Sequence, residues 1–300
     1  MPGGKFKLGK TLVIAGGMVL LSPFAFTLIE SSRPISRPPL PNPNGYDDFM
    51  KAQREMVVYD GDVTRATVEQ LRGYLAKNGE ALKFIRQGLA KECRIPVEFS
   101  TNYLFQRSLG DVKKLVWLLE ADGRLAELEQ RSNDATRIYL DAIRYGQESC
   151  RGGVMIDRLV GIACQASGMS WLQKVAGALD AKTCRKTAKQ LQEIDRRREP
   201  VAVVLRNERK WIRRNFTFRQ CVQAMIPIAA LNPVKRTQKD FVKKCTQIEL
   251  QLKRLMVEFA TRAYELDHGQ HPKSLNELVP DYLDAMPVDP TTGTNLTYLP

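Results

Sequence analysis

The segment LEADGRLAELEQRSNDATRIYLDAIRYGQ, residues 119–147, decides the fold class of this 300-residue chain. Apolar residues recur at helical spacing on both sides of a polar turn at Ser132 and Asn133. They are Leu119, Leu125 and Leu128 before the turn, and Ile138, Ala142 and Ile143 after it. Because spacings of three and four residues place side chains on one helix face, the segment predicts two amphipathic helices joined by a short turn.

The same periodicity extends outward from this hairpin, from Tyr46 to about Leu266. Thr67 and Gln70 have the form of a capping box, Asp180 is a helix-capping residue, and Pro200 suits a first helical position. The stripes are Leu71, Tyr74 and Leu75; Leu82, Ile85 and Leu89; Val112, Leu115 and Val116; Leu159, Ile162 and Ala163; Leu191 and Ile194. A last long helix is predicted over Thr237–Leu266, with Ile248, Leu252, Leu255, Phe259 and Ala263 on one face. The predicted fold class is mainly α.

The hairpin resembles one unit of a tetratricopeptide repeat. Gly123, Ala135, Tyr139 and Ala142 fall at that repeat's small and aromatic positions, where two helices approach closely. A 34-residue period is not repeated clearly on either side, although stable arrays need about three units. The resemblance therefore implies a body of stacked antiparallel helices.

The N-terminus contains an uncharged run, Thr11–Ile29 (TLVIAGGMVLLSPFAFTLI), preceded by Lys5, Lys7 and Lys10. In a helix this run rises about 28 Å, close to the thickness of a bilayer core. A basic leader before one apolar run predicts a cytoplasmic N-terminus, one crossing of a bacterial inner membrane, and a periplasmic body. The alternative is a secretory signal cleaved after Ala25, which Pro23 disfavours. Both place the body outside the cytoplasm.

The chain divides into four predicted parts. Residues 1–30 form the leader and transmembrane anchor, and residues 31–45 form a linker with five prolines, which favours an extended stalk. Residues 46–235 form a helical domain, and residues 236–300 form the long helix with a C-terminal tail.

The tail follows the long helix at Gly269, where glycine can adopt a terminating left-handed conformation. Ser274 and Glu277 are spaced to cap a short helix, and residues 295–298 form an incipient strand. Four apolar residues cannot form a core alone, so we expect them to pack on the end of the long helix: Leu275, Leu278, Tyr282 and Leu283.

Residues 264–298, YELDHGQHPKSLNELVPDYLDAMPVDPTTGTNLTY, resemble the region after the long helix in the major pseudopilin of type II secretion, which implies a small α+β tail. The chain also resembles membrane-anchored envelope proteins of planctomycete type. This resemblance rests on the linker residues 44–48 (NGYDD), on Cys150–Gly153 and on Ile156–Leu159. In pseudopilins the anchor continues into the long helix, whereas the helical body separates them here. Filament assembly and calcium binding are therefore not implied.

The chain is basic, with a formal net charge of +13. Anionic partners such as lipid head groups, cell-wall polymers or nucleic acid would be favoured by this charge. The basic residues are spread among acids along the helices, which predicts a solvated surface, and no clustered patch or reading motif for nucleic acid is expected.

Six cysteines occur without a CxxC motif, which disfavours zinc ribbons and thioredoxin-like sites. Small buried thiols are the expected role for most of them. Cys221 and Cys245 flank a proline-containing stretch and are the first pair to test for a disulfide.

No catalytic, cofactor-binding or metal site is predicted. The two histidines, His268 and His271, lack a zinc motif around them, and there is no GxSxG, GxxxxGK[ST] or GxGxxG. Acids that could serve as paired carboxylates in glycan cleavage are Asp47, Asp48, Glu92, Glu98, Glu127 and Glu129, for which solvated positions are expected. Asp157 and Arg158 lie between apolar residues, so they must pair with each other or find partners.

The sequence predicts a single-pass, membrane-anchored envelope protein that binds or scaffolds another component and has no enzymatic activity. Its expected partners are the membrane, through the N-terminal helix, and an envelope protein or an anionic envelope surface. Two alternatives stay open: an accessory component of a type II secretion or pilus-like system, and an envelope hydrolase whose carboxylates are not recognised.

Overall fold

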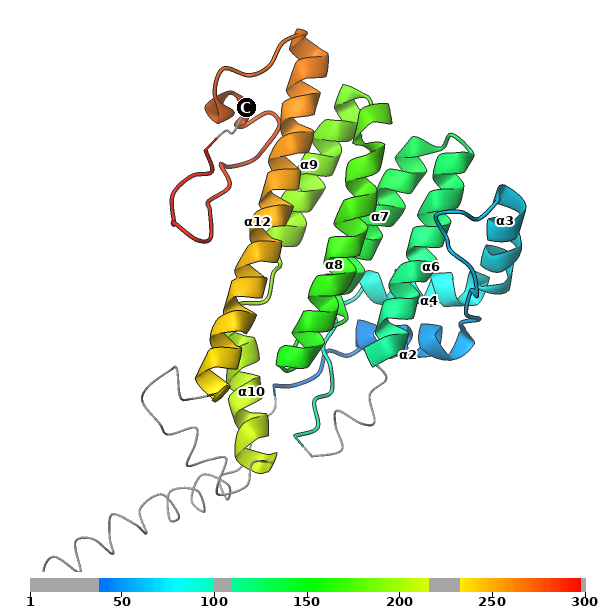
Figure 1. Cartoon of the computed structure of the whole chain (residues 1–300), viewed down its shortest axis with the longest axis vertical. Helices are drawn as coiled ribbons and strands as arrows, with labels where there is room; N and C mark the ends of the chain where they lie inside the picture. The colour runs from blue at the N-terminus through cyan, green and yellow to red at the C-terminus, as the bar shows by residue number, and fades with distance from the viewer. Residues whose placement is uncertain (1–37, 100–108, 216–232, 298–300) are drawn as a thin grey trace, which may run out of the picture.

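The computed structural model describes residues 38–99, 109–215 and 233–297, and this part of the chain is built of helices (Figure 1). They are α2 (Gly45–Glu55), α3 (Val68–Lys77), α4 (Gly79–Leu89), α6 (Leu109–Leu128), α7 (Ser132–Glu148), α8 (Met155–Val175), α9 (Ala181–Arg196), α10 (Val201–Asn215) and α12 (Pro233–His268). Short 3-10 helices η1 (Ala176–Ala178) and η3 (Leu275–Leu278) complete them. The predicted mainly α class is confirmed.

Within those ranges, no helix has both the length and the apolar character needed to cross a bilayer. The predicted anchor, Thr11–Ile29, and residues 31–37 of the linker lie outside the described ranges. The linker's last residue, Gly45, is the first residue of α2.

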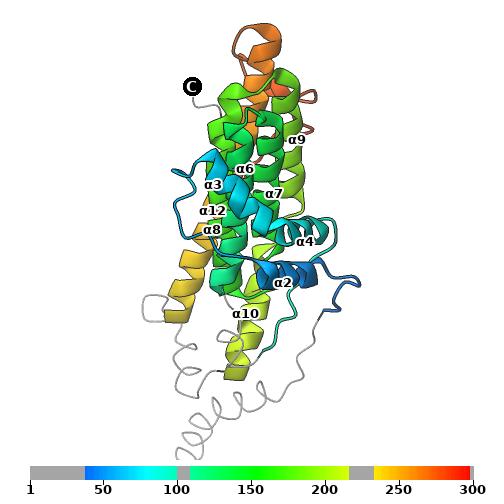
Figure 2. The same ribbon diagram turned by 90° about the vertical axis from the view of Figure 1, so that its right-hand side faces the viewer.

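The long helices stand side by side and form the body of the molecule (Figure 1). Helix α12 packs on α8 and α9, α8 packs on α7, and α7 packs on α6. Helices α2, α3 and α4 lie across the edge opposite α12, and in the turned view they cross the upright helices (Figure 2). One hydrophobic core runs through this assembly, from Phe49 and Leu71 at one edge to Phe259 and Leu283 at the other.

The predicted hairpin of α6 and α7 is confirmed, including its closest approach. A Cβ added to Gly123 would lie 2.2 Å from Cε1 of the buried Tyr139. Only a residue without a side chain therefore permits this helix separation. The predicted turn at Ser132 and Asn133 is wrong by two residues, because α7 already begins at Ser132 and the turn includes Gln130 with φ 60°.

Helices α7 and α8 are held still closer by glycines on both. A Cβ on Gly146 would lie 2.7 Å from the Gln165 backbone nitrogen, and one on Gly161 would lie 2.5 Å from the Gly146 carbonyl oxygen. A Cβ on Gly168 would lie 2.9 Å from the Ile143 backbone nitrogen. These are backbone contacts, so no side-chain movement can make room for a methyl group.

The predicted apolar stripe on α8 lies at the margin of its buried face. Leu159 and Ile162 are half-buried and pack against hydrophobic clusters, whereas Ala163 is exposed. The buried residues of α8 include Gly161, Cys164, Gly168 and Leu172. Backbone proximity to α7 selects small residues, which a search for large apolar side chains does not weigh.

The other helical predictions agree with the structure. Thr67 and Gln70 form a capping box, and Asp180 caps α9 by accepting from the Thr183 backbone nitrogen. Helix α10 begins at Val201, directly after Pro200. Helix α12 is longer than predicted at both ends, and its expected apolar face is buried.

The tail folds back on α12, as predicted. Gly269 ends the helix with φ +72°, and Leu275, Leu278, Tyr282 and Leu283 are buried in the main core. Two details differ. The Ser274 side chain does not cap η3, although Glu277 accepts a hydrogen bond from the Lys273 backbone nitrogen. Among the described tail residues, the expected strand is reduced to one antiparallel bridge, Val288 with Asn295.

Candidate functional site

A cavity of about 670 Å³ lies between α4, α7 and α9, and we call it the charged groove. Its basic side chains are Lys91, Arg94, Arg137, Arg144, Arg151 and Arg197. Its acidic side chains are Glu92, Asp141, Glu148, Glu193 and Glu199. Leu89, Leu140 and Ile194 add apolar surface between the charges. The volume falls in the range of ligand-binding clefts, about 300–1,000 Å³.

Side chains of α7 line the groove, and two of them bind the C-terminal ends of the neighbouring helices α4 and α9. Arg144 donates to the carbonyl oxygen of Leu89 at the end of α4, at 2.8 Å. Gln147 donates to the carbonyl oxygen of Ile194 near the end of α9, at 3.0 Å. The last carbonyls of a helix have no partner within the helix and carry its negative dipole end, so donors placed there stabilise both ends.

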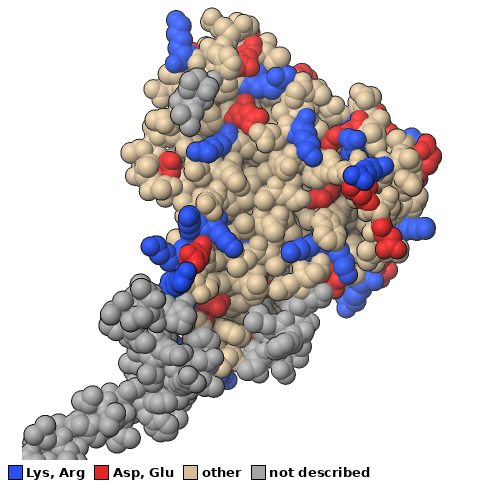
Figure 3. Space-filling view, in the orientation of Figure 1, with Lys and Arg blue, Asp and Glu red and all other residues tan. Residues whose placement is uncertain are grey.

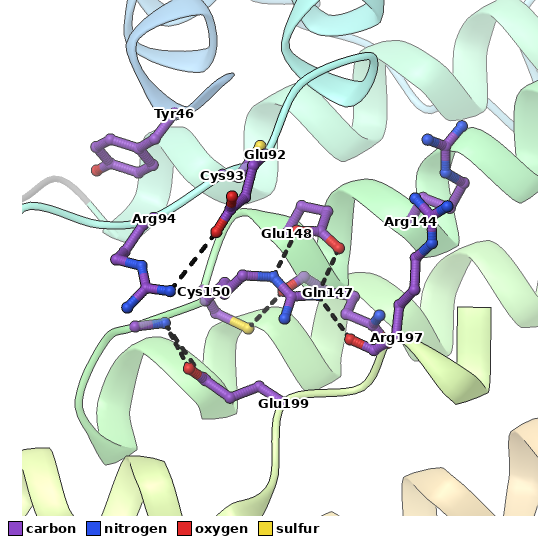
Figure 4. A network of polar contacts seen from close by, with 12 residues as sticks. Tyr46, Glu92, Cys93, Arg94, Arg144, Gln147, Glu148, Cys150, Arg197 and Glu199 are labelled. Atoms are coloured by element: carbon purple, nitrogen blue, oxygen red, sulfur yellow. Dashed lines mark hydrogen bonds and ion pairs between the residues drawn. The ribbon is translucent and has the colours of Figure 1, made fainter. Parts of the chain in front are cut away.

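Arg151 links α7 to the chain after α9. Its guanidinium binds both carboxylate oxygens of Glu148, at 2.6 and 2.7 Å, and donates to the carbonyl oxygen of Arg197 at 2.7 Å. Figure 4 shows Gln147, Glu148 and Arg197 converging at this point, with Glu199 below. A forked guanidinium–carboxylate pair fixes orientation, so this side of the groove is rigid.

Glu199 and Arg94 form the lower rim. The Glu199 carboxylate accepts from the Gly152 backbone nitrogen, at 3.0 and 3.2 Å, and Arg94 lies 3.6 Å from Glu92. Burial raises the pKa of Glu199, which the hydrogen bond from Gly152 partly offsets. Both residues also line a smaller cavity of about 150 Å³ beside α10.

Two arginines of the groove are largely exposed. The side chains of Arg137 and Arg197 are 57% and 65% exposed, so both are accessible to a partner. Asp141 lies beside Arg144 at 3.3 Å, and burial raises the pKa of Asp141 more than the neighbouring arginines lower it. Charges of both signs therefore face the groove, which suits a partner that also carries both.

A second hollow, of about 370 Å³, has aromatic walls. Tyr59, Tyr74, Trp117 and Trp171 line it, and the Trp117 side chain is 51% exposed. The buried Glu120 also lines it, and burial raises the pKa of this carboxyl despite hydrogen bonds from Ser167 and Trp171. Aromatic faces next to a carboxyl are suited to a cationic group, and the ammonium of Lys174 already lies over the Trp171 ring, 4.0 Å from its centroid.

The acids considered for glycan cleavage occupy separate structural roles. Asp48 is buried and pairs with Lys51 and Lys91, while Glu127 pairs with Arg124 and accepts a hydrogen bond from Tyr139. Glu129 pairs with Arg72 and Arg131. The solvated positions expected for Asp47, Glu92 and Glu98 are confirmed, and that for Asp48 is wrong. Ion pairs to bases lower the pKa of Asp48 against its burial.

Asp157 and Arg158 are both buried, and of the two expected arrangements, pairing with each other or finding other partners, the structure shows the second. Asp157 accepts from the Val154 backbone nitrogen at 2.9 Å and so caps the start of α8. Arg158 donates from Nη1 to the Cys150 sulfur at 3.7 Å, and among the described residues its Nε and Nη2 have no hydrogen-bond partner. The Asp157 carboxylate is therefore satisfied by the backbone at the start of α8 and not by the neighbouring guanidinium of Arg158.

The cysteines and histidines also have structural surroundings. Cys93, Cys150, Cys164, Cys184 and Cys245 are buried free thiols, as predicted, while Cys221 lies outside the described ranges. Burial raises the pKa of Cys93 and Cys164 to about 12, which keeps them as unreactive thiols near neutral pH.

His271 contacts Glu265 at 2.6 Å, and His268 stacks on Tyr264. Within the described part of the chain, no three metal-ligating side chains cluster.

Comparisons with protein-family models, with curated proteins and with solved structures found no match to this chain. The sequence contained one signal for the charged groove, the arginines spaced along residues 137–151. It did not reveal that α4 and α9 end against them.

Proposed function

We propose that this protein is a single-pass envelope protein whose helical body binds or scaffolds another envelope protein through the charged groove. The uncharged run Thr11–Ile29 supports the anchor, and the proline-rich linker supports a body held outside the membrane. In this proposal the protein has no enzymatic activity and needs no cofactor.

The observation that carries the proposal is the composition of the groove. Six basic and five acidic side chains surround apolar surface from Leu89, Leu140 and Ile194. A simple anion would meet as much repulsion as attraction there. A polypeptide segment can instead place charges of both signs opposite their complements and bury apolar side chains between them.

The groove can be tested with a photo-crosslinking amino acid in the full-length protein, in cells. Gln190 is exposed in the groove, whereas Gln247 is exposed on α12 outside it. We expect a crosslinked protein from position 190 and none from position 247, followed by identification of the partner by mass spectrometry.

Charge reversal then separates recognition from proximity. Arg137→Glu with Arg197→Glu should weaken binding of the identified partner at least about tenfold, because both side chains are exposed and reverse the complementary charge. The matched control is Arg65→Glu with Lys83→Glu, which makes the same charge change outside the groove. The proposal would be contradicted if the groove variant and the control variant gave equal amounts of crosslinked product. It would also be contradicted if no crosslinked product formed from position 190.

The anchor has an independent test. A reporter active only outside the cytoplasm, fused after Gly45, should be active, and the protein should remain with membranes after an alkaline wash. A soluble form beginning near Phe26 would instead show that the signal is cleaved.

A second proposal, an accessory role in a type II secretion or pilus-like system, rests on the tail. Its residues resemble a pseudopilin segment, yet Leu278 and Leu283 are buried in this chain's own core. That packing favours an intramolecular cap. Recovery of secretion-apparatus subunits with the full-length protein, dependent on residues 269–300, would favour the accessory role.

A further inference from the structure

Basic residues gather at one end of the molecule, formed by α10 and residues 233–245 of α12, which we call the basic end. Its basic residues are Arg206, Arg209, Lys210, Arg213 and Arg214 in α10, with Lys235, Arg236, Lys239, Lys243 and Lys244 in α12. Glu208 and Asp240 are the acids of these two segments. Ten bases minus two acids give +8, a large share of the chain's +13.

The two segments are held together by a small apolar cluster. Met155, Val204, Phe241 and Cys245 are buried against one another, so α10 and the start of α12 form one unit. All the bases of the basic end except the half-buried Lys210 are exposed. The prediction of bases mixed evenly with acids does not hold here. Figure 3 shows several Lys and Arg side chains close together, with Asp or Glu side chains between them, above the residues drawn in grey.

One of the two acids does not face outward to offset this charge. Glu208 turns inward and accepts from the Met155 backbone nitrogen at 2.9 Å. Within each helix, Arg206, Arg209 and Arg213, and likewise Arg236, Lys239 and Lys243, are three or four residues apart. Like charges at this spacing repel each other, so a negatively charged partner would relieve a cost that is built into both helices.

The position of the basic end indicates which anionic partner it can reach. Pro38, where the described chain begins, lines the same cavity as Val203 and Asn207 of α10. Eight residues, 30–37, separate it from the end of the predicted anchor at Ile29. Nine residue steps span at most about 30 Å, so a membrane anchor that ends at Ile29 would meet the bilayer within about 30 Å of Pro38, on the side of the molecule where α10 lies.

We propose that the basic end faces the membrane and binds anionic lipid head groups, which orients the charged groove relative to the bilayer. This inference rests on the anchor in the proposed function. Exposed Lys and Arg near an anionic leaflet are attracted over roughly one Debye length, about 10 Å at moderate salt. The tether of at most about 30 Å limits the distance from the bilayer, and the attraction acts when the basic end comes within that range.

The test uses the full-length protein in nanodiscs of neutral phosphatidylcholine, with and without about one third phosphatidylglycerol, both carrying a head-group quencher. A fluorescent amino acid is placed at Gln247, just beyond the basic end, or at Leu266, about 28 Å further along α12. Anionic lipid should raise quenching at position 247 about twofold and leave position 266 unchanged, and high salt should remove the increase.

The decisive variant is Lys239→Glu with Lys243→Glu and Lys244→Glu, which should abolish the increase at position 247. The matched control, Lys83→Glu with Lys182→Glu and Lys186→Glu, makes the same change in net charge elsewhere and should retain it. Quenching at position 247 that does not depend on lipid charge would overturn the inference. An equal reduction of the quenching increase by both triple variants would also overturn it. Tight binding of an oligonucleotide by the basic end without any lipid effect would also overturn it.

The anchor can fail separately. If the protein does not incorporate into neutral nanodiscs, the anchor of the proposed function is absent. Co-sedimentation of the same protein with anionic vesicles then tests the basic end alone. Absence of salt-sensitive co-sedimentation would overturn the lipid-binding inference even in that case.

Discussion

Glycine at position 161 should be required for the packing of α7 on α8, and Gly161→Ala tests this directly. A methyl group there would lie 2.5 Å from both the Gly146 carbonyl oxygen and the Cys150 sulfur. The carbonyl belongs to the backbone of α7, so the helices must move apart. Overpacking of this kind costs about 1–3 kcal/mol, and the contact with backbone places this site in the upper part of that range.

Part of the cost is offset by helix propensity, since alanine is about 1 kcal/mol more favourable than glycine inside a helix. The net loss should be about 1–2 kcal/mol of unfolding free energy. At about 2–4 °C per kcal/mol for a domain of this size, the melting temperature should fall by about 2–8 °C.

Gly73→Ala is the matched control. Gly73 lies inside α3, is exposed, and a Cβ there would have no neighbour within 4 Å. The same substitution should raise stability by about 0.5–1 kcal/mol through propensity alone. Circular dichroism of both full-length variants, during heating and in urea, measures the two changes. If Gly161→Ala is as stable as the wild type or more so, the helices are not packed as described.

Three further predictions concern single sites. Leu278→Ala should cost about 2–5 kcal/mol of unfolding free energy, because the side chain is buried in the core. The control His271→Ala, at a largely exposed ion pair, should change the unfolding free energy by less than about 0.5 kcal/mol. Equal effects of the two substitutions would show that the tail does not pack on the core. Asn78→Ala should cost about 1–3 kcal/mol of unfolding free energy, because the Asn78 side chain accepts from the Val57 nitrogen at 2.8 Å and donates to the Val57 and Tyr74 carbonyl oxygens. Unchanged unfolding in urea would contradict those contacts. Burial raises the pKa of Glu120, so the part of the wild-type stability that depends on the protonated carboxyl is lost as pH rises through that pKa. The stability of Glu120→Gln relative to wild type should therefore increase as the pH is raised from about pH 4. A relative stability that is flat or decreasing with pH would oppose that assignment.

Local signals predicted much of the helical framework. The stripe on α12, the capping box at Thr67 and the terminating Gly269 each depend on residues within a few positions of one another. Helical periodicity and capping are local properties, so one sequence suffices to read them. The burial of Leu278 and Leu283 followed because a short apolar segment has to cover itself on the nearest helix.

The candidate sites depend on residues that are far apart in the chain. Arg144 meets Leu89, and Gln147 meets Ile194, only because α4 and α9 both end against α7. Likewise, α10 and the start of α12 are each basic in sequence, but their contact through Phe241 and Val204 makes one surface of them. No local pattern encodes which helix ends meet.

The sequence by itself determined that the described chain is mainly helical, where α3, α9 and α10 begin, that the last long helix ends before Gly269, and which face of α12 is buried. Only the tertiary structure decided which face of α8 is buried, that Asp157 caps a helix while Arg158 contacts a thiol, and where charges converge. The physical reason is that propensity and periodicity act within one helix, whereas close approach at Gly161, capping by distant side chains and summed charge arise between helices.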